Sequence, residues 1–405
     1  MDFVNNHIKE SRLIIAHFIK WFFLSLISGI SVGLVITLFL KSLEYVTQTR
    51  QIYAWLLYLL PVGGYIISFL YYKYGKDSSK GNNLIIERIN NGKGRIPFRM
   101  APLVFLGTVA THLFGGSAGR EGTGVQIGAS ICSELGELLK LDESDKNLII
   151  ISGISSGFGV VFGTPISGTV FGLEVTSIGK MRYEAIVPCF VASYIGNSIS
   201  NILKVHHMNY SMVGVIDDVS IFYKVTLCSI LFGITSKVFS ELTHILKKYF
   251  SYHIRMPYNR SFLGGVIIIV LVFIVNSRIY LGLSLDLLKY SFEIPVNNYD
   301  FILKLIFTSI TLGSGYQGGE VTPLFVIGAT LGNTLSFMIG LPMSFLAGLG
   351  MIGVFCGATK TPIASFIMGV ELFGSMNMKY LFVACVISYV FAGKSGIYTS
   401  QEYNI

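Results

Sequence analysis

Two apolar motifs occur twice in this chain, in the same order and at nearly the same spacing. The segment at 164–175, TPISGTVFGLEV, returns at 361–372 as TPIASFIMGVEL, with five of the twelve positions identical. The segment from Gly119 to Ala129 returns from Gly319 to Ala329, and both copies end in Ile-Gly-Ala. Motifs that repeat in order indicate an internal duplication. We therefore predict two homologous halves, residues 1–203 and 219–405, joined by a linker at 204–218.

Both halves are apolar enough to lie in a membrane. The chain is 52% hydrophobic and 13% charged, whereas about 25% of the residues of a soluble domain are charged. The run from Trp21 to Leu40 has the roughly 20 residues that cross a bilayer, and it is longer than the core of a signal peptide. Further apolar segments follow at 52–72, 153–175, 219–242, 262–276, 302–313, 321–341, 344–373 and 379–392. These segments predict an all-α membrane protein that crosses the lipid bilayer several times.

The basic residues indicate an orientation. The net charge is +8, and the lysines and arginines cluster between the apolar runs, which is the distribution that sets membrane topology rather than one that binds nucleic acid. The connection from Lys73 to Arg99 is strongly basic, so we expect this connection and the N-terminus in the cytoplasm. The polar loop from Lys204 to Asp218 carries mixed charges and is expected outside.

Neither a metal nor another cofactor is indicated. The five cysteines, at 132, 189, 228, 356 and 385, lie singly in or beside apolar stretches and are typical of reduced packing residues. His206, His207, Asp217 and Asp218 share one polar loop, but no further histidine accompanies an acidic cluster, so a solvated loop is favoured over a metal site.

A carboxylate interrupts the apolar sequence at Gly119-Arg120-Glu121-Gly122-Thr123. An ionisable residue within a membrane segment indicates function by default. The glycines leave the backbone open, and a helix that begins after them points free N–H groups at the break, which suits an anion. A structural pairing of Glu121 with Arg120 is the alternative, but sequence neighbours do not face each other on a helix. Because burial favours the protonated form of a carboxyl group, we predict that Glu121 carries a proton and competes with the anion.

The second half has a matching break at Glu320-Val321-Thr322. Broken helices at matching positions in two repeats point to an ion site near the middle of the membrane. Glu320 is either a second proton-coupling residue or a carboxylate that only stabilises its helix. Asn82 offers amide donors to an anion, and the alternative is that it is only a turn residue. Tyr398 offers a hydroxyl, and the alternative is that it is only an aromatic residue at the membrane interface. The predicted anion-binding residues are Asn82, Gly119, Arg120, Gly122, Thr123, Val321, Thr322 and Tyr398.

These motifs resemble those of the CLC family of anion channels and anion/proton antiporters over nearly the whole chain. Residues 119–122 match the family's GREGP motif, with Thr123 in place of its proline, and residues 319–323 occupy the place of its GxFxP motif. Tyr398 matches the pore tyrosine of the family. Where chloride-handling members carry GSGIP, this chain has Gly81-Asn82-Asn83. Together with GYQGGEVTP at 315–323, these departures resemble the fluoride-selective bacterial branch, which exchanges fluoride for protons.

The resemblance implies a CLC-type fold of two inverted-topology repeats with broken and re-entrant helices. It also implies a homodimer with one pore per subunit in the bacterial inner membrane, exporting fluoride in exchange for protons with Glu121 as the gate. A chloride/proton antiporter or a passive chloride channel of the same fold is the alternative. Val175 stands where many chloride antiporters have a second internal glutamate, which leaves the proton route open. A membrane hydrolase built on Gly153-Ile154-Ser155-Ser156-Gly157 is a further alternative, but it would need a strand–turn–helix context.

Overall fold

The structure is a computed structural model that describes residues 2–205, 207, 210–216 and 218–403. The described part of the first half forms eight α-helices: α1 (Asp2–Ile52), α2 (Leu60–Leu70), α3 (Asn82–Asn91), α4 (Met100–Phe114), α5 (Glu121–Leu138), α6 (Glu143–Phe162), α7 (Pro165–Glu174) and α8 (Ile186–Ile202). The second half forms eight more: α9 (Val219–His253), α10 (Pro257–Val275), α11 (Leu285–Glu293), α12 (Asp300–Gly313), α13 (Val321–Ile339), α14 (Met343–Thr359), α15 (Pro362–Phe373) and α16 (Met378–Phe391).

Short segments complete the described chain. Short stretches of 3-10 or π helix lie at Ala54–Leu59, Tyr71–Gly75, Lys76–Lys80 and Tyr183–Ala185. Two-residue strands, β1 (Ser177–Ile178) and β2 (Glu402–Tyr403), pair in parallel and join the C-terminal end of the chain to the first half.

Six helical segments in the described residues are long and apolar enough to cross a membrane: Ile15–Ile52, Ala54–Lys80, Tyr183–Ile202, Val219–His253, Pro257–Val275 and Val321–Ile339. Four apolar helices are shorter, namely α4, α14, α15 and α16. Helices too short to span the bilayer, between longer ones, are typical of transporters whose helices break inside the membrane.

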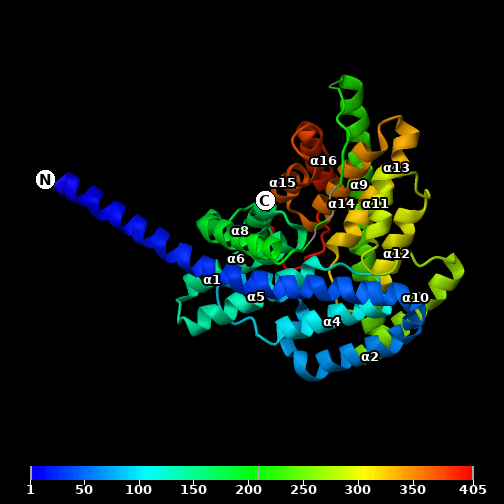
Figure 1. Cartoon of the computed structure of the whole chain (residues 1–405), viewed down its shortest axis with the longest axis horizontal. Helices are drawn as coiled ribbons and strands as arrows, with labels where there is room; N and C mark the ends of the chain where they lie inside the picture. The colour runs from blue at the N-terminus through cyan, green and yellow to red at the C-terminus, as the bar shows by residue number, and fades with distance from the viewer. Residues whose placement is uncertain (1, 206, 208–209, 217, 404–405) are drawn as a thin grey trace.

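The helices pack in the same pairs in both halves. α5 packs against α6 and α1 against α8, while α13 packs against α14 and α9 against α16. Figure 1 shows the blue-to-green first half beside the second half, which runs from green at α9 to red, with the N-terminal end of α1 extending away from the body. The α5–α6 and α13–α14 contacts need glycine. A Cβ atom on Gly128 would lie 2.1 Å from the Gly153 carbonyl oxygen, and one on Gly328 would lie 2.1 Å from that of Gly350.

The repeated threonine–proline motif starts a short helix in each half. Thr164 and Thr361 have almost the same non-helical backbone angles, φ −121° and ψ 78° against φ −123° and ψ 71°. Pro165 and Pro362 follow as the first helical residues, where a missing N–H costs no hydrogen bond. The sequence repeat is therefore also a repeat of local geometry.

Two carboxylates join the halves by capping each other's short helix. Glu174, the last residue of α7, accepts hydrogen bonds of 3.1 and 2.8 Å from the N–H groups of residues 363 and 364 at the start of α15. Glu371, near the end of α15, accepts bonds of 3.0 and 2.7 Å from the N–H groups of residues 166 and 167 at the start of α7. α7 and α15 are therefore antiparallel, and each carboxylate satisfies two N–H groups that a helix start leaves free.

Two details differ from the sequence-based expectation. The predicted segment 344–373 is divided into α14 and α15, because Lys360 adopts a left-handed conformation (φ 62°) just before the threonine–proline start. α8 and α11 were not among the predicted segments. The boundary of the halves at 204–218 stays a prediction, and it fits the interval between α8, ending at Ile202, and α9, starting at Val219.

Candidate functional site

The two predicted breaks meet in space. The Gly119 N–H donates to the Gly319 carbonyl oxygen at 2.6 Å, and the Gly319 N–H donates to that of Gly119 at 2.8 Å. This antiparallel bridge brings together the starts of α5 and α13. A side chain does not fit at Gly319, because a Cβ atom there would lie 2.8 Å from the backbone nitrogen of Gly122. Two positive helix ends therefore converge on one point, an arrangement that attracts negative charge.

The Glu121 side chain occupies this point and is fully buried. Its Oε2 atom accepts hydrogen bonds from the backbone N–H groups of Arg120 at 3.0 Å and Thr322 at 3.1 Å. Its Oε1 atom accepts a hydrogen bond from the Thr322 hydroxyl. The carboxylate is thus held by donors from both halves, as a bound anion would be.

A cavity of about 740 Å³ lies on one side of the breaks. The partly exposed Glu320 and the buried Tyr398, from the C-terminal segment, line it together with Asn82. Its lysine and arginine side chains come from the α2–α3 connection and from the adjoining ends of α9 and α10, and they are Lys76, Lys80, Lys247, Lys248 and Arg260. We call it the inner cavity, because the connection from Lys73 to Arg99, which carries Lys76 and Lys80, is predicted to face the cytoplasm.

Asn82 begins α3 and lies beside the start of α5. Its Nδ2 atom is 3.0 Å from the place that a Cβ atom on Gly122 would take. Its Oδ1 atom is buried and has no hydrogen-bond partner among the described residues, and the same holds for Oε1 of Gln126, which also lines the inner cavity. Buried amides usually have their hydrogen bonds satisfied. Two amide oxygens at the cavity wall are therefore free to accept a hydrogen bond from a further group.

The Arg120 side chain does not line the inner cavity and faces the other side of the breaks. Its side chain lines an outer cavity of about 610 Å³, which lies between α1 and the segment 278–286. Arg120 also lines a smaller cavity of about 30 Å³ with Thr322 and Tyr210, a residue of the predicted exterior loop. Glu121 and its donor Thr322 hence lie between cavities on the two sides of the molecule.

Corresponding connections of the two halves lie on opposite sides. Gln51, at the end of α1, and Ala54, in the α1–α2 connection, line the outer cavity, whereas Lys248 and Pro257, which flank the α9–α10 connection, line the inner cavity. The next pair of corresponding connections is reversed in the same way. The α2–α3 connection lines the inner cavity, and the α10–α11 connection lines the outer cavity. The two repeats are therefore inverted relative to each other.

Thr123 and Val321 are the remaining predicted site residues. The Thr123 hydroxyl is paired with that of Thr108 in α4, with 2.7 Å between the two oxygens, so it faces α4. Val321 is buried as the first residue of α13. The structure brings Glu121, Gly119, Gly122, Thr322 and Asn82 together, whereas the side chains of Arg120 and Thr123 point elsewhere.

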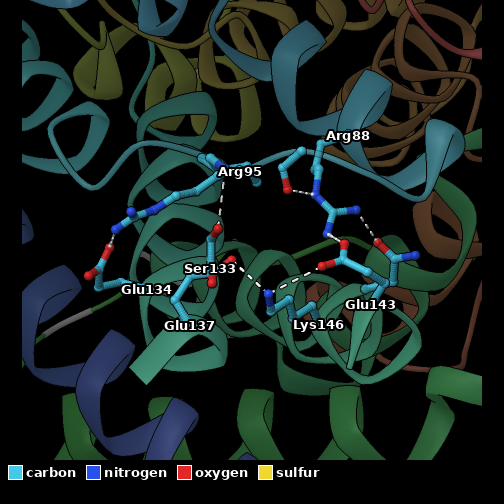
Figure 2. Close-up of polar contacts among 10 residues, drawn as sticks. Arg88, Arg95, Ser133, Glu134, Glu137, Glu143 and Lys146 are labelled. Atoms are coloured by element: carbon cyan, nitrogen blue, oxygen red, sulfur yellow. Dashed lines mark hydrogen bonds and ion pairs between the residues drawn. The ribbon is translucent and has the colours of Figure 1, made fainter. Parts of the chain in front are cut away.

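A polar network holds α3, and with it Asn82, in place (Figure 2). The Arg88 guanidinium is 4% exposed and donates to Asn147 Oδ1 at 2.7 Å and Glu143 Oε2 at 2.9 Å, both at the start of α6. Lys146 bridges Glu143 to Glu137 near the end of α5. α3 is therefore tied, through α6, to the helix that begins with Glu121.

Sequence reasoning missed one residue close to the breaks. Lys304 lies in α12, inside the predicted segment 302–313, and is fully buried. Its Nζ atom donates to Ser117 Oγ at 3.0 Å, two residues before Gly119. A lysine inside an apolar run is itself a signal of function, and that signal was present in the sequence.

The structure does not give the hydrolase motif its required context. Ser155 lies in the middle of α6, and its hydroxyl donates to the Thr169 carbonyl oxygen at 3.4 Å. A nucleophile elbow needs a strand–turn–helix instead. Among the described residues no three His, Cys, Asp or Glu side chains gather as metal ligands, and His206 and Asp217 lie outside the described residues.

Inverted repeats whose broken helices meet at a buried carboxylate, with a cavity on either side, define a membrane protein built to move ions. The family model described as voltage gated chloride channel matches residues 63–393. This chain therefore belongs to the voltage-gated chloride channel family, the CLC family.

Relatives and solved structures agree with this assignment. A chloride/fluoride channel protein of Pseudomonas syringae pv. tomato is 40% identical over 401 residues, covering 97% of this chain and 88% of the relative. The crystal structure of a CLC-type fluoride/proton antiporter is similar with a TM-score of 0.93 and 34% identity, over 95% of this chain and 98% of that chain. A slow cyanobacterial Cl−/H+ antiporter shares the fold with a TM-score of 0.78 at 20% identity, over 94% of this chain and 96% of that chain.

Proposed function

We propose that this protein is an antiporter that exports fluoride from the cytoplasm in exchange for protons, with Glu121 as the proton-carrying gate. The observation that carries the proposal is the position of the Glu121 carboxylate, bound by N–H and O–H donors at the meeting point of α5 and α13. Two similar proteins support the choice of ion. One is described as a chloride/fluoride channel protein and the other as a CLC-type fluoride/proton antiporter.

The mechanism follows from competition for the same donors. A charged Glu121 carboxylate occupies the N–H groups at the helix starts and excludes an anion. When the carboxyl group takes up a proton it loses its charge, the donors favour an anion instead, and the side chain withdraws. Proton and anion therefore alternate at one place, which couples their opposite movements.

The other site residues receive roles by their placement. Asn82 donates its amide N–H groups to the anion beside Gly122, while Gly119 and Val321 supply the open backbone at the two helix starts. Tyr398 donates its hydroxyl from the wall of the inner cavity. Glu320, at the rim of the same cavity, passes protons between Glu121 and the cytoplasm. Arg120 draws anions to the outer side, and Thr123 fixes the start of α5 through Thr108.

Fluoride is favoured over chloride by the amide at position 82. A small anion is strongly hydrated, so it needs more hydrogen-bond donors to replace its water, and an amide supplies two where a serine supplies one. Flux of fluoride and chloride from liposomes containing the purified protein, under equal gradients, tests the choice. Faster fluoride efflux is expected, and chloride efflux as fast or faster favours the chloride/proton antiporter or chloride channel.

We propose a bacterial inner-membrane location with the inner cavity in the cytoplasm, as the basic side chains at its rim favour. Single cysteines introduced at Lys93 and at Ser211 in the exterior loop, in a variant without the five native cysteines, report the orientation. An impermeant thiol reagent added to intact cells should label position 211 and leave position 93 unlabelled. Labelling of position 93 alone means the reverse orientation.

We propose a homodimer in which each subunit keeps its own pathway. Large apolar side chains on α7, α8, α15 and α16 are exposed, among them Ile166, Ile186, Phe190, Ile363 and Phe382. A continuous apolar face formed by both halves is suited to a second copy within the bilayer. Glutaraldehyde crosslinking at low protein density in liposomes should trap dimers, and recovery of monomers alone contradicts the proposal.

A further inference from the structure

The C-terminal segment is bound to α3 through two side chains that have no role in the mechanism so far. Asn83, the second residue of α3, accepts a hydrogen bond of 3.1 Å at Oδ1 from the N–H of Ser400. Glu87, one helical turn further along, accepts a hydrogen bond of 3.1 Å at Oε1 from the Ser400 hydroxyl. Residues four apart lie on the same face of a helix, so one face of α3 binds both donors of Ser400. We call these two hydrogen bonds the clamp.

The clamp lies next to two of the predicted anion ligands. Asn83 directly follows Asn82, and Ser400 stands two residues after Tyr398. The bond between Asn83 and Ser400 spans 317 positions of the chain. Asn82, Asn83 and Tyr398 all line the inner cavity. The clamp therefore joins, from opposite ends of the chain, the two elements that carry these ligands.

The glutamate of the clamp is held by a second partner. Lys80 donates to Oε2 of Glu87 at 2.8 Å, while the other carboxylate oxygen accepts from Ser400. The Lys80 and Glu87 side chains are 52% and 37% exposed, and such an exposed ion pair contributes little stability. Its effect is to keep the carboxylate turned toward the C-terminal segment.

Other bonds attach the C-terminal segment elsewhere. The N–H of Ile397 donates to the Ala358 carbonyl oxygen at 2.9 Å, and the Gln401 amide donates to the carbonyl oxygens of Thr359 at 3.0 Å and Val175 at 2.8 Å. β2 then pairs with β1. These bonds hold the segment to the end of α14 and to the chain after α7, whereas the clamp holds it to α3.

We propose that Asn83 and Glu87 are positioning residues, which keep the Tyr398 hydroxyl at the separation from the Asn82 amide that suits a small anion. The inference rests on the proposed function, because it takes Asn82 and Tyr398 as fluoride ligands. Hydrogen-bond lengths vary little, so a small anion is bound by both donors only when they lie close together, whereas a larger anion bridges a wider gap. Without the clamp the segment moves away from α3, and fluoride loses more than chloride.

Fluoride titration of the full-length protein in detergent tests the clamp. The double variant Asn83→Ala/Ser400→Ala removes both hydrogen bonds. Its fluoride affinity should fall about two- to tenfold, because the loss cannot exceed the contribution of the one hydroxyl that moves away. Thr399→Val, which removes the exposed neighbouring hydroxyl, is the control and should keep wild-type affinity. Wild-type affinity in the double variant overturns the proposal.

A mutant cycle shows whether the effect passes through Tyr398. Tyr398→Phe removes the hydroxyl and keeps the ring. In this background Asn83→Ala/Ser400→Ala should not weaken fluoride binding further, because the donor that the clamp positions is already absent. Ser400→Ala alone leaves α3 unaltered and should show the same non-additivity. A further loss equal to that in the wild-type background contradicts positioning of Tyr398.

Selectivity gives a readout that a purely structural role would not change. In liposomes under equal gradients, the ratio of fluoride to chloride efflux should be lower for the double variant than for the wild type and for Thr399→Val. An equal slowing of both ions contradicts the role in selecting a small anion.

Amide hydrogen exchange separates this inference from the proposed function, since it needs no fluoride. Exchange reports local opening of hydrogen bonds. The amides of residues 399–401 should exchange about two- to tenfold faster in Asn83→Ala than in the wild type, and unchanged exchange overturns the clamp. If the wild type binds no fluoride but the segment exchanges faster in the variant, the proposed function fails and the positioning of the segment by α3 stands.

Discussion

The backbone N–H of Thr322 donates to the carboxylate of Glu121 at 3.1 Å, although the two residues are 201 positions apart in the chain. The bond joins the first residue of α5 to the second residue of α13, and the Thr322 hydroxyl binds the same carboxylate. The carboxylate at the start of α5 is therefore bound by an N–H and an O–H group of the other repeat, both at the start of α13. Neither half can form this site alone.

Replacing Thr322 with valine keeps the shape of the side chain and removes its hydroxyl donor. A hydrogen bond to a charged group contributes about 1.5–3 kcal/mol, so we expect a loss of roughly that size in unfolding free energy. Thr330→Val is the matched control, because the Thr330 hydroxyl donates within α13, to the carbonyl oxygens of Val326 and Ile327. Thermal unfolding of both variants checks the difference, and an equal loss shows that the contact with Glu121 adds nothing.

Asn82→Ala should weaken fluoride binding. The variant removes the amide beside Gly122, and one lost hydrogen bond of about 1.5 kcal/mol corresponds to roughly tenfold in affinity. Asn90→Ala, in the same helix, is the control, because the Asn90 amide donates to the Thr176 carbonyl oxygen at 2.9 Å. Calorimetric titration with fluoride compares the two variants. Affinity that is unchanged in Asn82→Ala removes this residue from the site.

The reciprocal caps between α7 and α15 should stabilise the fold without taking part in transport. Glu174→Gln and Glu371→Gln each remove a charged acceptor of two N–H groups. We expect each to lower the unfolding free energy by about 1.5–3 kcal/mol and to leave fluoride affinity within about twofold. A variant that unfolds like the wild type and loses transport shows that the carboxylate serves the ion pathway instead.

Arg88→Met should destabilise the protein and weaken fluoride binding together, because α3 carries both Arg88 and Asn82. The buried guanidinium makes two hydrogen bonds to α6, and their loss should cost roughly 2–4 kcal/mol. Arg95→Met is the control, since the exposed Arg95–Glu134 ion pair lies on the surface, where such pairs contribute little. Wild-type fluoride affinity in folded Arg88→Met protein contradicts the positioning role.

The sequence predicted the repeats and the breaks because both depend on local signals. Clustered glycines, a threonine–proline pair and an isolated carboxylate each interrupt an apolar run within a few residues, so Gly119, Glu121 and the starts of α7 and α15 were recognised directly. α8 was missed because serines and asparagines dilute its apolar run, from Ser193 to Asn201. α11 was missed because it has only nine residues and three of them are charged.

Contacts between the halves were outside the reach of sequence patterns. The pairing of Gly119 with Gly319 and the donors of Thr322 follow from the inverted packing of two repeats, which no local window contains. The hydrogen bond between the Thr123 and Thr108 hydroxyls likewise depends on how α4 packs against α5. Lys304 was visible as a charge in an apolar run, but its partners Ser117 and Ser284 come from elements remote in sequence.

The most direct test of the proposed mechanism is fluoride-driven proton movement in liposomes containing the Glu121→Gln protein. Glutamine has nearly the shape of a protonated glutamate and cannot bind or release a proton. Under an outward fluoride gradient, wild-type liposomes should take up protons against a proton gradient. The variant should show no fluoride-driven proton movement, whether or not it still conducts fluoride. Proton uptake by Glu121→Gln liposomes at the wild-type rate would contradict the assignment of Glu121 as the coupling residue.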